Sequence, residues 1–176
     1  MNPERELIEK PLSSEELAVR YRAMCEDPCL NNVPGKLEMD VWGRMVMSPP
    51  SYYHGLVQGR LGVRLANLAG GQVLGEVPIA TAAGLFVPDL AWASDAFVTR
   101  HPKDETPLSR APELCLEVVS PSNSVKELQE KMGAYLDAGA EEVWLVFLRS
   151  KVCQFYGKEG LLEQSRFAVD LGGLFD

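Results

Sequence analysis

Two acidic residues lie inside otherwise apolar stretches of the sequence. Asp89, which follows Pro88, lies within residues 85–92, and Glu117 lies within residues 114–119. A carboxylate among apolar neighbours is costly to bury unless it pairs with a cation or binds a metal. Two such carboxylates on adjacent strands would form an oxygen-rich site suited to Mg²⁺ or Mn²⁺. The alternative is that each acid faces water from a strand at the edge of a sheet.

Lys131 is a candidate for the positive charge of such a site. It lies beside the apolar stripe of a helix expected over residues 124–138, one turn from Tyr135. From there its ammonium group could lean over the sheet toward Glu117. The alternative is a surface ion pair with Glu127, because Glu127 and Lys131 stand in the favoured i,i+4 order.

The segment 48–75 is locally basic. It contains neither Asp nor Glu, although the chain has 25 acidic residues. Arg60 and Arg64 lie on a polar stripe of the helix expected in this segment, which favours them as contacts for a nucleic acid. His54 lies on the apolar face of the same helix, where it is either a site residue or a core histidine with its hydrogen bonds satisfied.

Hydrophobic periodicity and turn residues predict the elements that position these side chains. Helices are expected over residues 13–27, 51–69 and 124–138, the first with a capping box formed by Ser13 and Glu16. Two short strands are expected within 37–47, and further strands over 72–80, 86–94, 113–119, 142–148, 152–156 and 162–169. Residues 30–36 are expected to form a loop around Pro34-Gly35, and residues 99–112 a solvated loop. This order predicts an α/β (α+β) fold, a mixed sheet flanked by helices.

Length and composition indicate a single domain. The chain has 176 residues, 46% of them apolar and 24% charged, and no apolar run approaches the ~20 residues of a membrane span. Neither a signal peptide nor a membrane partner is expected, so the cytoplasm is the expected location. The four cysteines are expected to be reduced, structural thiols. The net charge of -8 argues, at first sight, against a nucleic-acid partner.

Several motifs together resemble those of one known family. They are Pro88-Asp89, residues 117–122, Lys131 with Tyr135 and Gly139, residues 142–146, and, earlier in the chain, Glu38, Gly43, residues 47–51 and His54. In order and spacing this set resembles the Uma-two putative restriction endonuclease family of the PD-(D/E)xK nuclease superfamily. The resemblance covers about residues 13–157.

The resemblance implies a restriction-endonuclease-like core with the metal-binding acids at Asp89 and Glu117. The superfamily lysine normally lies two residues after the second acid, where this chain has Val119. The resemblance therefore implies that Lys131 in the following helix is its equivalent. Glu127 matches an acid that the family often carries in that helix. The chain also departs from the family at Phe147-Leu148, where an Asp is common.

The function implied by the resemblance is Mg²⁺- or Mn²⁺-dependent hydrolysis of phosphodiester bonds in DNA. Glu38 or His54 could complete the metal shell or position the substrate, and Tyr135 is a further secondary candidate. A homodimer is expected, with one domain over residues 1–176: an N-terminal helix and loop (1–36) and a nuclease-type core (37–170). The alternative is a catalytically inactive, dimeric binding or scaffold protein of the same fold.

The distribution of charge weakens the objection to a nucleic-acid substrate. Residues 111–150 hold seven acids and three bases, so this segment alone contributes -4 of the net charge. Glu117 and Glu127 belong to that segment, and a bound divalent cation would offset part of their charge. The sequence therefore predicts weak, salt-sensitive and metal-dependent binding of nucleic acid.

Overall fold

The structure is a computed structural model of the chain. It describes residues 10–30, 36–47, 51–120 and 123–176. Three features expected from the sequence lie outside the described residues: Pro34-Gly35, residues 48–50 of the resemblance, and Pro121-Ser122. No helix in the described ranges is long and apolar enough to cross a membrane.

A six-stranded sheet forms the centre of the molecule. Its strand order is β10 (Gly160–Leu162), β9 (Val152–Gly157), β8 (Glu142–Phe147), β7 (Leu114–Val119), β6 (Leu90–Ser94) and β3 (Gly71–Gly75). Only the pair β7 and β8 is parallel within this sheet, and α4 (Val125–Asp137) connects the two strands. Every residue of β7 is buried, as expected of an apolar strand covered on both faces.

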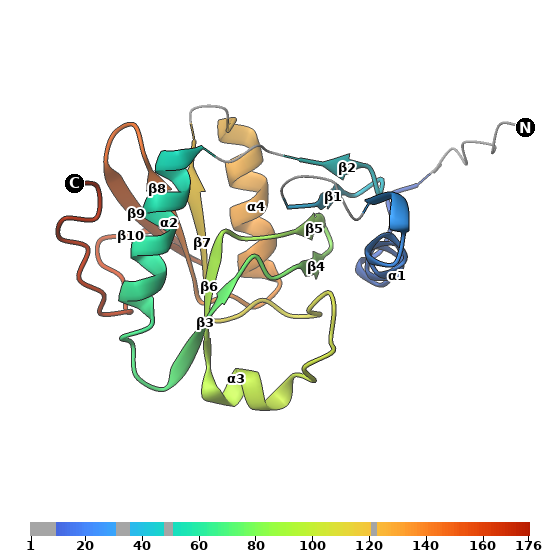
Figure 1. The fold of residues 1–176 in the computed structure, drawn as a ribbon, viewed down its shortest axis with the longest axis horizontal. Coiled ribbons are helices and arrows are strands. Elements are labelled where there is room, and N and C mark those ends of the chain that lie inside the picture. Colours follow the sequence, from blue (N-terminus) through green and yellow to red (C-terminus); the bar gives the residue numbers. More distant parts are fainter. Residues whose placement is uncertain (1–9, 31–35, 48–50, 121–122) are drawn as a thin grey trace, which may run out of the picture.

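A four-stranded antiparallel sheet lies beside the larger sheet. Its strand order is β2 (Met45–Val46), β1 (Glu38–Asp40), β5 (Gly84–Phe86) and β4 (Ile79–Thr81). The helix α1 (Ser14–Cys25) packs on it through Leu17, which shares a core cluster with Met39 and Leu85. Figure 1 shows α1 and this small sheet at the N-terminal end of the molecule, with β8 to β10 at the other end.

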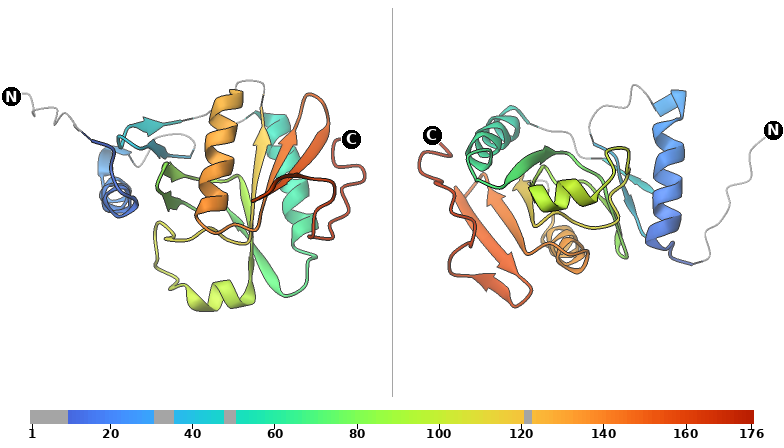
Figure 2. Two further views of the ribbon diagram at one scale, coloured as in Figure 1. Left: turned by 180° about the vertical axis from the view of Figure 1, so that it is seen from behind. Right: turned by 90° about the horizontal axis from the view of Figure 1, so that it is seen from below.

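Two helices cover opposite faces of the large sheet, as Figure 2 shows. Side chains of β7 alternate between these faces. Leu116 and Val118 join a core cluster with Leu61 of α2 (Tyr52–Leu65). Cys115 belongs instead to the cluster that includes Tyr135 of α4. Glu117 has the parity of Cys115, so its carboxylate points to the side of α4.

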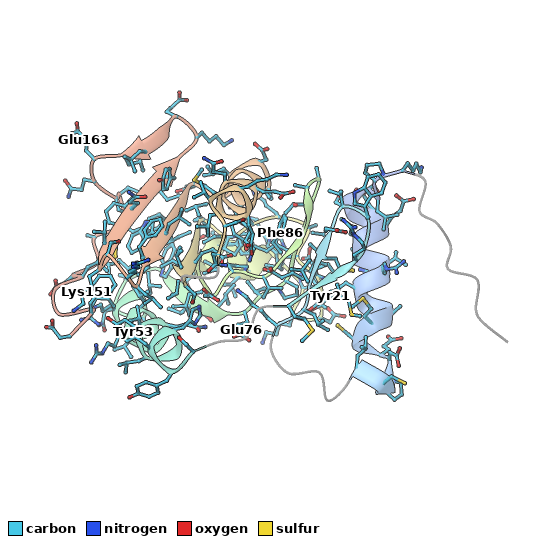
Figure 3. The ribbon with its side chains drawn as sticks, turned by 90° about the horizontal axis from the view of Figure 1, so that it is seen from above. Tyr21, Tyr53, Glu76, Phe86, Lys151 and Glu163 are labelled. Carbon is cyan, nitrogen blue, oxygen red and sulfur yellow. The ribbon has the colours of Figure 1, made fainter. Side chains whose placement is uncertain are left out.

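The side-chain view shows how the smaller sheet joins the core. Phe86 is buried near the middle of the molecule, and Tyr21 lies on the side of α1 that faces the small sheet (Figure 3). Phe86 belongs to the α4 cluster, where its ring meets that of Tyr135 edge-on at 6.3 Å. The end of β5 is thereby fixed against α4, close to Glu117.

Most expected elements are present. The fold class is confirmed as a mixed α+β arrangement of sheets flanked by helices. The capping box of α1 is formed by Ser13 and Glu16. The helix α2 ends at Leu65 rather than at 69, because the following N–H groups of Asn67 and Leu68 bond to carbonyls three residues back.

Two expected strands are divided between the two sheets. The stretch 86–94 is interrupted at residues 87–89, because Pro88 has no N–H group for a ladder. The stretch 72–80 likewise splits, its first part in β3 and its last part in β4. The chain therefore passes from the large sheet to the small sheet between β3 and β4 and returns between β5 and β6, where Asp89 lies.

Two further expectations are wrong in part. Residues 163–169 form no strand; Phe167 and Val169 pack against the α2 cluster without joining the ladder. The segment 99–112 is only partly solvated, because Leu108 is buried and bonds through its main chain to Pro78 and Ala80. Two short helices were also not expected from the sequence, α3 (Asp95–Arg100) and the 3-10 helix η1 (Pro28–Leu30).

Candidate active site

Asp89 and Glu117 lie side by side at the junction of β6 and β7. The Asp89 N–H donates to the carbonyl of Leu116 at 3.0 Å, and the N–H of Val118 donates to Oδ2 of Asp89 at 2.7 Å. Asp89 precedes β6, and its N–H group and carboxylate extend the pairing between β6 and β7 by one residue. Both acids are buried, with exposed fractions of 3% for Asp89 and 6% for Glu117. Neither acid faces water from a sheet edge.

The ammonium group of Lys36 lies between the two acids. Its Nζ is 2.7 Å from Oδ1 of Asp89 and 3.7 Å from Oε2 of Glu117. It also donates to the carbonyl of Val87 at 2.7 Å. Lys36 was not among the residues predicted from the sequence. The available signal was its spacing from Glu38, since residues two apart in an extended chain share a face.

Lys131 is buried and makes its shortest contacts with Glu38. Its Nζ lies 2.8 Å from Oε2 and 2.9 Å from Oε1 of Glu38, and 3.6 Å from Oε1 of Glu117. Oε1 of Glu38 also accepts the N–H of Val87 at 2.9 Å. Glu38 therefore links the small sheet, the crossing at Val87 and the helix α4.

The alternative pairing of Lys131 with Glu127 does not occur. Glu127 lies in the first turn of α4, where its N–H donates to the N-cap side chain of Ser124. Within the described ranges its carboxylate makes no hydrogen bond or ion pair with Asp89, Glu117 or Lys131. Glu127 therefore stands apart from the cluster that the other candidates form.

Tyr135 holds the second carboxylate in place. Its hydroxyl donates to Oε1 of Glu117 at 2.7 Å, and both side chains are buried. Tyr135 lies one turn after Lys131, so α4 presents both groups to the same carboxylate. The strand β7 and the helix that follows it thus supply three adjoining groups of the site.

The helix α2 contributes two contacts to Asp89. Nε2 of His54 lies 3.1 Å from Oδ2 of Asp89, and the side-chain amide of Gln58 donates to the Asp89 carbonyl at 2.8 Å. A carboxylate oxygen only accepts, so Nε2 of His54 carries the proton. Gln58 was missed in the sequence, although it follows His54 by one helical turn. Among the described residues, Nδ1 of His54 has no hydrogen-bond partner.

Burial and neighbouring charges act in opposite directions on the two acids. Burial opposes ionisation of Asp89, but the hydrogen bond from His54 and the charge of Lys36 outweigh it and lower the pKa to about 2. Burial raises the pKa of Glu117, and Asp89 and Glu38 raise it further, against the opposing effect of Lys36 and Lys131. The carboxylates of Glu117 and Glu38 in turn raise the pKa of Lys131 although burial opposes it.

The two arginines expected to contact nucleic acid are engaged with the C-terminal segment. Arg64 donates to the carbonyls of Asp170 at 3.0 Å and Gly172 at 2.8 Å. Arg60 donates to the carbonyls of Leu174 at 3.2 Å and Asp176. These bonds tie the segment after β10 to α2. A role for Arg60 and Arg64 in binding nucleic acid stays a prediction.

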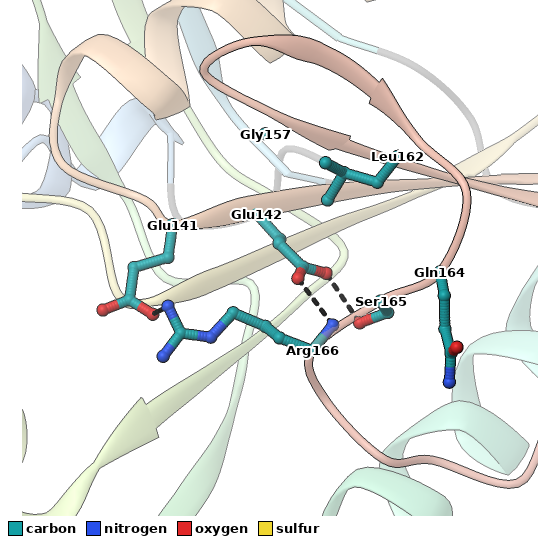
Figure 4. A pocket seen from close by; sticks show the side chains of 7 residues that line it. All are labelled: Glu141, Glu142, Gly157, Leu162, Gln164, Ser165 and Arg166. Atoms are coloured by element: carbon teal, nitrogen blue, oxygen red, sulfur yellow. Dashed lines mark hydrogen bonds and ion pairs between the residues drawn. The ribbon is translucent and has the colours of Figure 1, made fainter.

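A second group of polar residues lies away from this cluster, in the pocket of Figure 4. Glu142 at the start of β8 accepts from the hydroxyl of Ser165 at 2.6 Å and the N–H of Arg166 at 2.8 Å. It also accepts from the indole N–H of Trp144 at 2.9 Å. These contacts fill the acceptor positions of a buried carboxylate and fasten the chain after β10, which indicates a structural role.

The acids of the cluster offer suitable donors for a hard divalent cation. Lys36 Nζ already sits among two carboxylate oxygens and one carbonyl oxygen, the donor types that Mg²⁺ and Mn²⁺ prefer. In the described part of the chain, no group of three or more His, Cys, Asp or Glu side chains is arranged to hold a metal. A metal at this position would therefore have two carboxylate side chains, those of Asp89 and Glu117, together with the carbonyl of Val87 as its protein ligands.

The fold is restriction-endonuclease-like: a mixed sheet flanked by helices, with the strand–helix–strand unit of β7, α4 and β8. The paired acids and Lys131 lie where this unit meets the smaller sheet. The chain belongs to the Uma2 family, described as "Putative restriction endonuclease", whose profile matches residues 19–172. The fold is similar to the crystal structure of a putative nuclease belonging to DUF820 from Anabaena variabilis. The TM-score is 0.68 at 16% identity, over 94% of this chain and 98% of the other. No curated protein matches the sequence.

Proposed function

We propose that this protein is a metal-dependent endonuclease that hydrolyses phosphodiester bonds in DNA. The observation that carries the proposal is the shared cation position of Asp89 and Glu117, both of which face the ammonium of Lys36. Acids that share a cation position can hold a metal that promotes phosphodiester hydrolysis, and an adjoining lysine can offset the charge that develops on the phosphate. Membership of the Uma2 family supports a nucleic acid as the substrate.

Each residue has a distinct part in the proposed reaction. Asp89 and Glu117 would hold Mg²⁺ or Mn²⁺. When bound, the metal lowers the pKa of a coordinated water and offsets charge at the phosphate. Lys131, 3.6 Å from Glu117, supplies positive charge beside the phosphate as negative charge develops on it.

Three neighbours act as positioning residues. Glu38 fixes the ammonium of Lys131 through both carboxylate oxygens. Tyr135 fixes Glu117, and His54 fixes Asp89 through its Nε2–H. Because Glu38 and Tyr135 are buried and His54 is half-buried, the acids are already oriented before a substrate arrives.

A second candidate function is a non-catalytic binding or scaffold protein of the same fold. The observation in its favour is that the charges of the cluster already satisfy one another: Lys36 pairs with Asp89, and Lys131 pairs with Glu38. A site of this kind is stable without a metal. In this case Asp89 and Glu117 would be structural, and their replacement would reduce stability alone.

A homodimer is part of the proposal. The small sheet ends at β2, where Met45 and Val46 are 53% and 39% exposed. Exposed apolar side chains on an edge strand are suited to contact a second copy of the chain. Light scattering after size-exclusion chromatography measures the mass directly, and a monomer at all concentrations would contradict the dimer.

The decisive experiment compares cleavage of supercoiled plasmid and single-stranded DNA by matched variants. Asp89→Asn, Glu117→Gln and Lys131→Met each remove a proposed catalytic group, whereas Glu130→Gln and Lys126→Gln change exposed residues of α4. We expect the Mg²⁺- or Mn²⁺-dependent activity of the first three variants to be at least about 100-fold lower than that of the unmodified protein. The two controls should retain it, and EDTA should abolish it.

The pattern across the variants separates the candidates. Equal cleavage by all six proteins would point to a contaminating nuclease and would contradict the proposal. Cleavage of RNA without cleavage of DNA would contradict the proposed substrate. Absence of cleavage together with an intact dimer would favour the scaffold function.

A further inference from the structure

We propose that Lys36 is a built-in competitor of the metal: its ammonium occupies the cation position of Asp89 and Glu117, and a divalent metal binds only by displacing it. This inference rests on the proposed function and specifies how the same site is regulated. If Lys36 competes in this way, its ammonium lowers the affinity of the site for a divalent metal. It also predicts that the protein is stable and inactive when divalent metal is scarce.

The first support is the set of oxygens around Lys36. Its Nζ lies 2.7 Å from Oδ1 of Asp89, 2.7 Å from the carbonyl of Val87 and 3.7 Å from Oε2 of Glu117. A Mg²⁺ ion bonds to such oxygens at about 2.0–2.1 Å. A metal that shared these oxygens would therefore overlap with the ammonium, so the two cations exclude each other.

The second support is the balance of charge in the cluster. Its carboxylates come from Glu38, Asp89 and Glu117, and its ammonium groups come from Lys36 and Lys131. Together these groups carry a net charge of about -1 when all are ionised. Removal of Lys36 leaves about -2, which a single divalent cation neutralises, whereas metal and Lys36 together would leave an excess positive charge.

The third support is the difference between the two lysines. The side chain of Lys131 is 6% exposed and is held by both oxygens of Glu38. That of Lys36 is 14% exposed, more than those of Asp89 at 4% and Glu117 at 7%. Lys36 therefore forms the solvent side of the cluster. Its flexible four-carbon stem lets the ammonium move into water while Lys131 stays in place.

The main test is Mn²⁺ binding by isothermal titration calorimetry, with no nucleic acid present. Lys36→Gln keeps a side chain of similar length without the charge and should bind Mn²⁺ at least about tenfold more tightly than the unmodified protein. Lys36→Arg keeps the charge and should bind as weakly as the unmodified protein. Lys126→Gln removes a charge from the exposed face of α4 and should leave the affinity unchanged.

Asp89→Asn identifies where the metal binds. Combined with Lys36→Gln, it should reverse the gain in affinity. Equal affinity of the unmodified protein and Lys36→Gln, with binding lost in Asp89→Asn, would overturn the competition and leave the proposed metal site intact. Weaker binding by Lys36→Gln would also overturn it. Absence of Mn²⁺ binding in every protein would overturn both proposals.

A second measurement uses the unmodified protein and does not depend on a variant that folds. Brief treatment with acetic anhydride labels accessible amines, and peptide mass spectrometry reads each lysine separately. Saturating Mn²⁺ should raise the labelling of Lys36 severalfold and leave that of Lys126 unchanged. Unchanged labelling of Lys36 in the metal-bound protein would overturn the inference.

Discussion

The ammonium of Lys131 in α4 lies 2.8 Å from Oε2 of Glu38 in β1, and both side chains are buried. This ion pair joins the small sheet to α4, the helix that connects β7 to β8 and covers one face of the large sheet. It also determines the direction in which Lys131 approaches Glu117. The lysine that the family resemblance assigns to catalysis is therefore held by an acid from the other sheet.

Replacement of Glu38 should destabilise the protein. Glu38→Gln leaves the buried ammonium of Lys131 without its nearest opposite charge, which costs about 3 kcal/mol in comparable buried pairs. The free energy of unfolding in urea, followed by circular dichroism, measures the loss. Glu130→Gln on the exposed face of α4 is the control and should unfold like the unmodified protein. A stable Glu38→Gln protein would show that the pair contributes little.

Tyr135→Phe tests the hydrogen bond to Glu117. The change removes only the hydroxyl, so Oε1 of the buried Glu117 carboxylate loses the hydrogen bond that it accepts from Tyr135. We expect a loss of about 1–3 kcal/mol in the free energy of unfolding. Tyr52→Phe is the matched control, because Tyr52 is 86% exposed. If both variants unfold alike, Glu117 does not depend on Tyr135.

Asp89 should make stability depend on pH in strongly acidic solution. Its pKa is lowered from 3.8 to about 2, because the hydrogen bond from His54 and the charge of Lys36 outweigh the rise that burial alone would cause. A lowered pKa stabilises the native state at pH values above 3.8, and this contribution disappears as the pH falls through about 2. It amounts to about 2 kcal/mol.

The measurement compares unfolding of the metal-free protein with that of Asp89→Asn across this pH range. The stability difference between the two should narrow as the pH falls. Asp104→Asn replaces an exposed aspartate and should follow the unmodified protein at every pH. A difference independent of pH would contradict the lowered pKa of Asp89.

Arg64→Ala tests whether the basic stripe of α2 has a structural role. Arg64 donates to the carbonyls of Asp170 and Gly172, so its loss should release the C-terminal segment and reduce stability by about 1 kcal/mol. Proteolysis of that segment, read by mass spectrometry, should accelerate. Arg149→Ala removes an exposed guanidinium elsewhere and should leave the segment protected.

The same variant addresses the predicted contact with nucleic acid. If Arg64 contacts phosphate, Arg64→Ala should reduce the slope of affinity against salt concentration by about 1. An unchanged slope with a loosened C-terminal segment would assign Arg64 to the fold alone.

The central part of the fold was predictable because its pattern is local. The run of apolar residues in β7, the cap at Ser124 and the amphipathic repeat of α4 each lie within one short window. The acids Asp89 and Glu117 stood out because they interrupt apolar stretches. Helical spacing predicted the face of α4 on which Lys131 lies. It did not predict that Lys131 would pair with Glu38.

The missed features depend on contacts between distant segments. Lys36 lies in a polar stretch that resembles any solvated loop, and only the crossing of the chain at Val87 brings it to Asp89. Phe167 and Val169 have the spacing of a strand, but they pack against the α2 cluster instead of pairing. Local periodicity reports which side chains become buried, and it does not report which partner buries them.

The span of the pair between Glu38 and Lys131 has a consequence during protein synthesis. The two residues are 93 positions apart, so a ribosome needs roughly 5–20 s to add the lysine after the glutamate. Until α4 has emerged, the nascent chain lacks the ammonium of Lys131, which contacts both Glu38 and Glu117 in the folded protein. A product truncated before α4 would therefore lack the lysine to which the proposed reaction assigns a part.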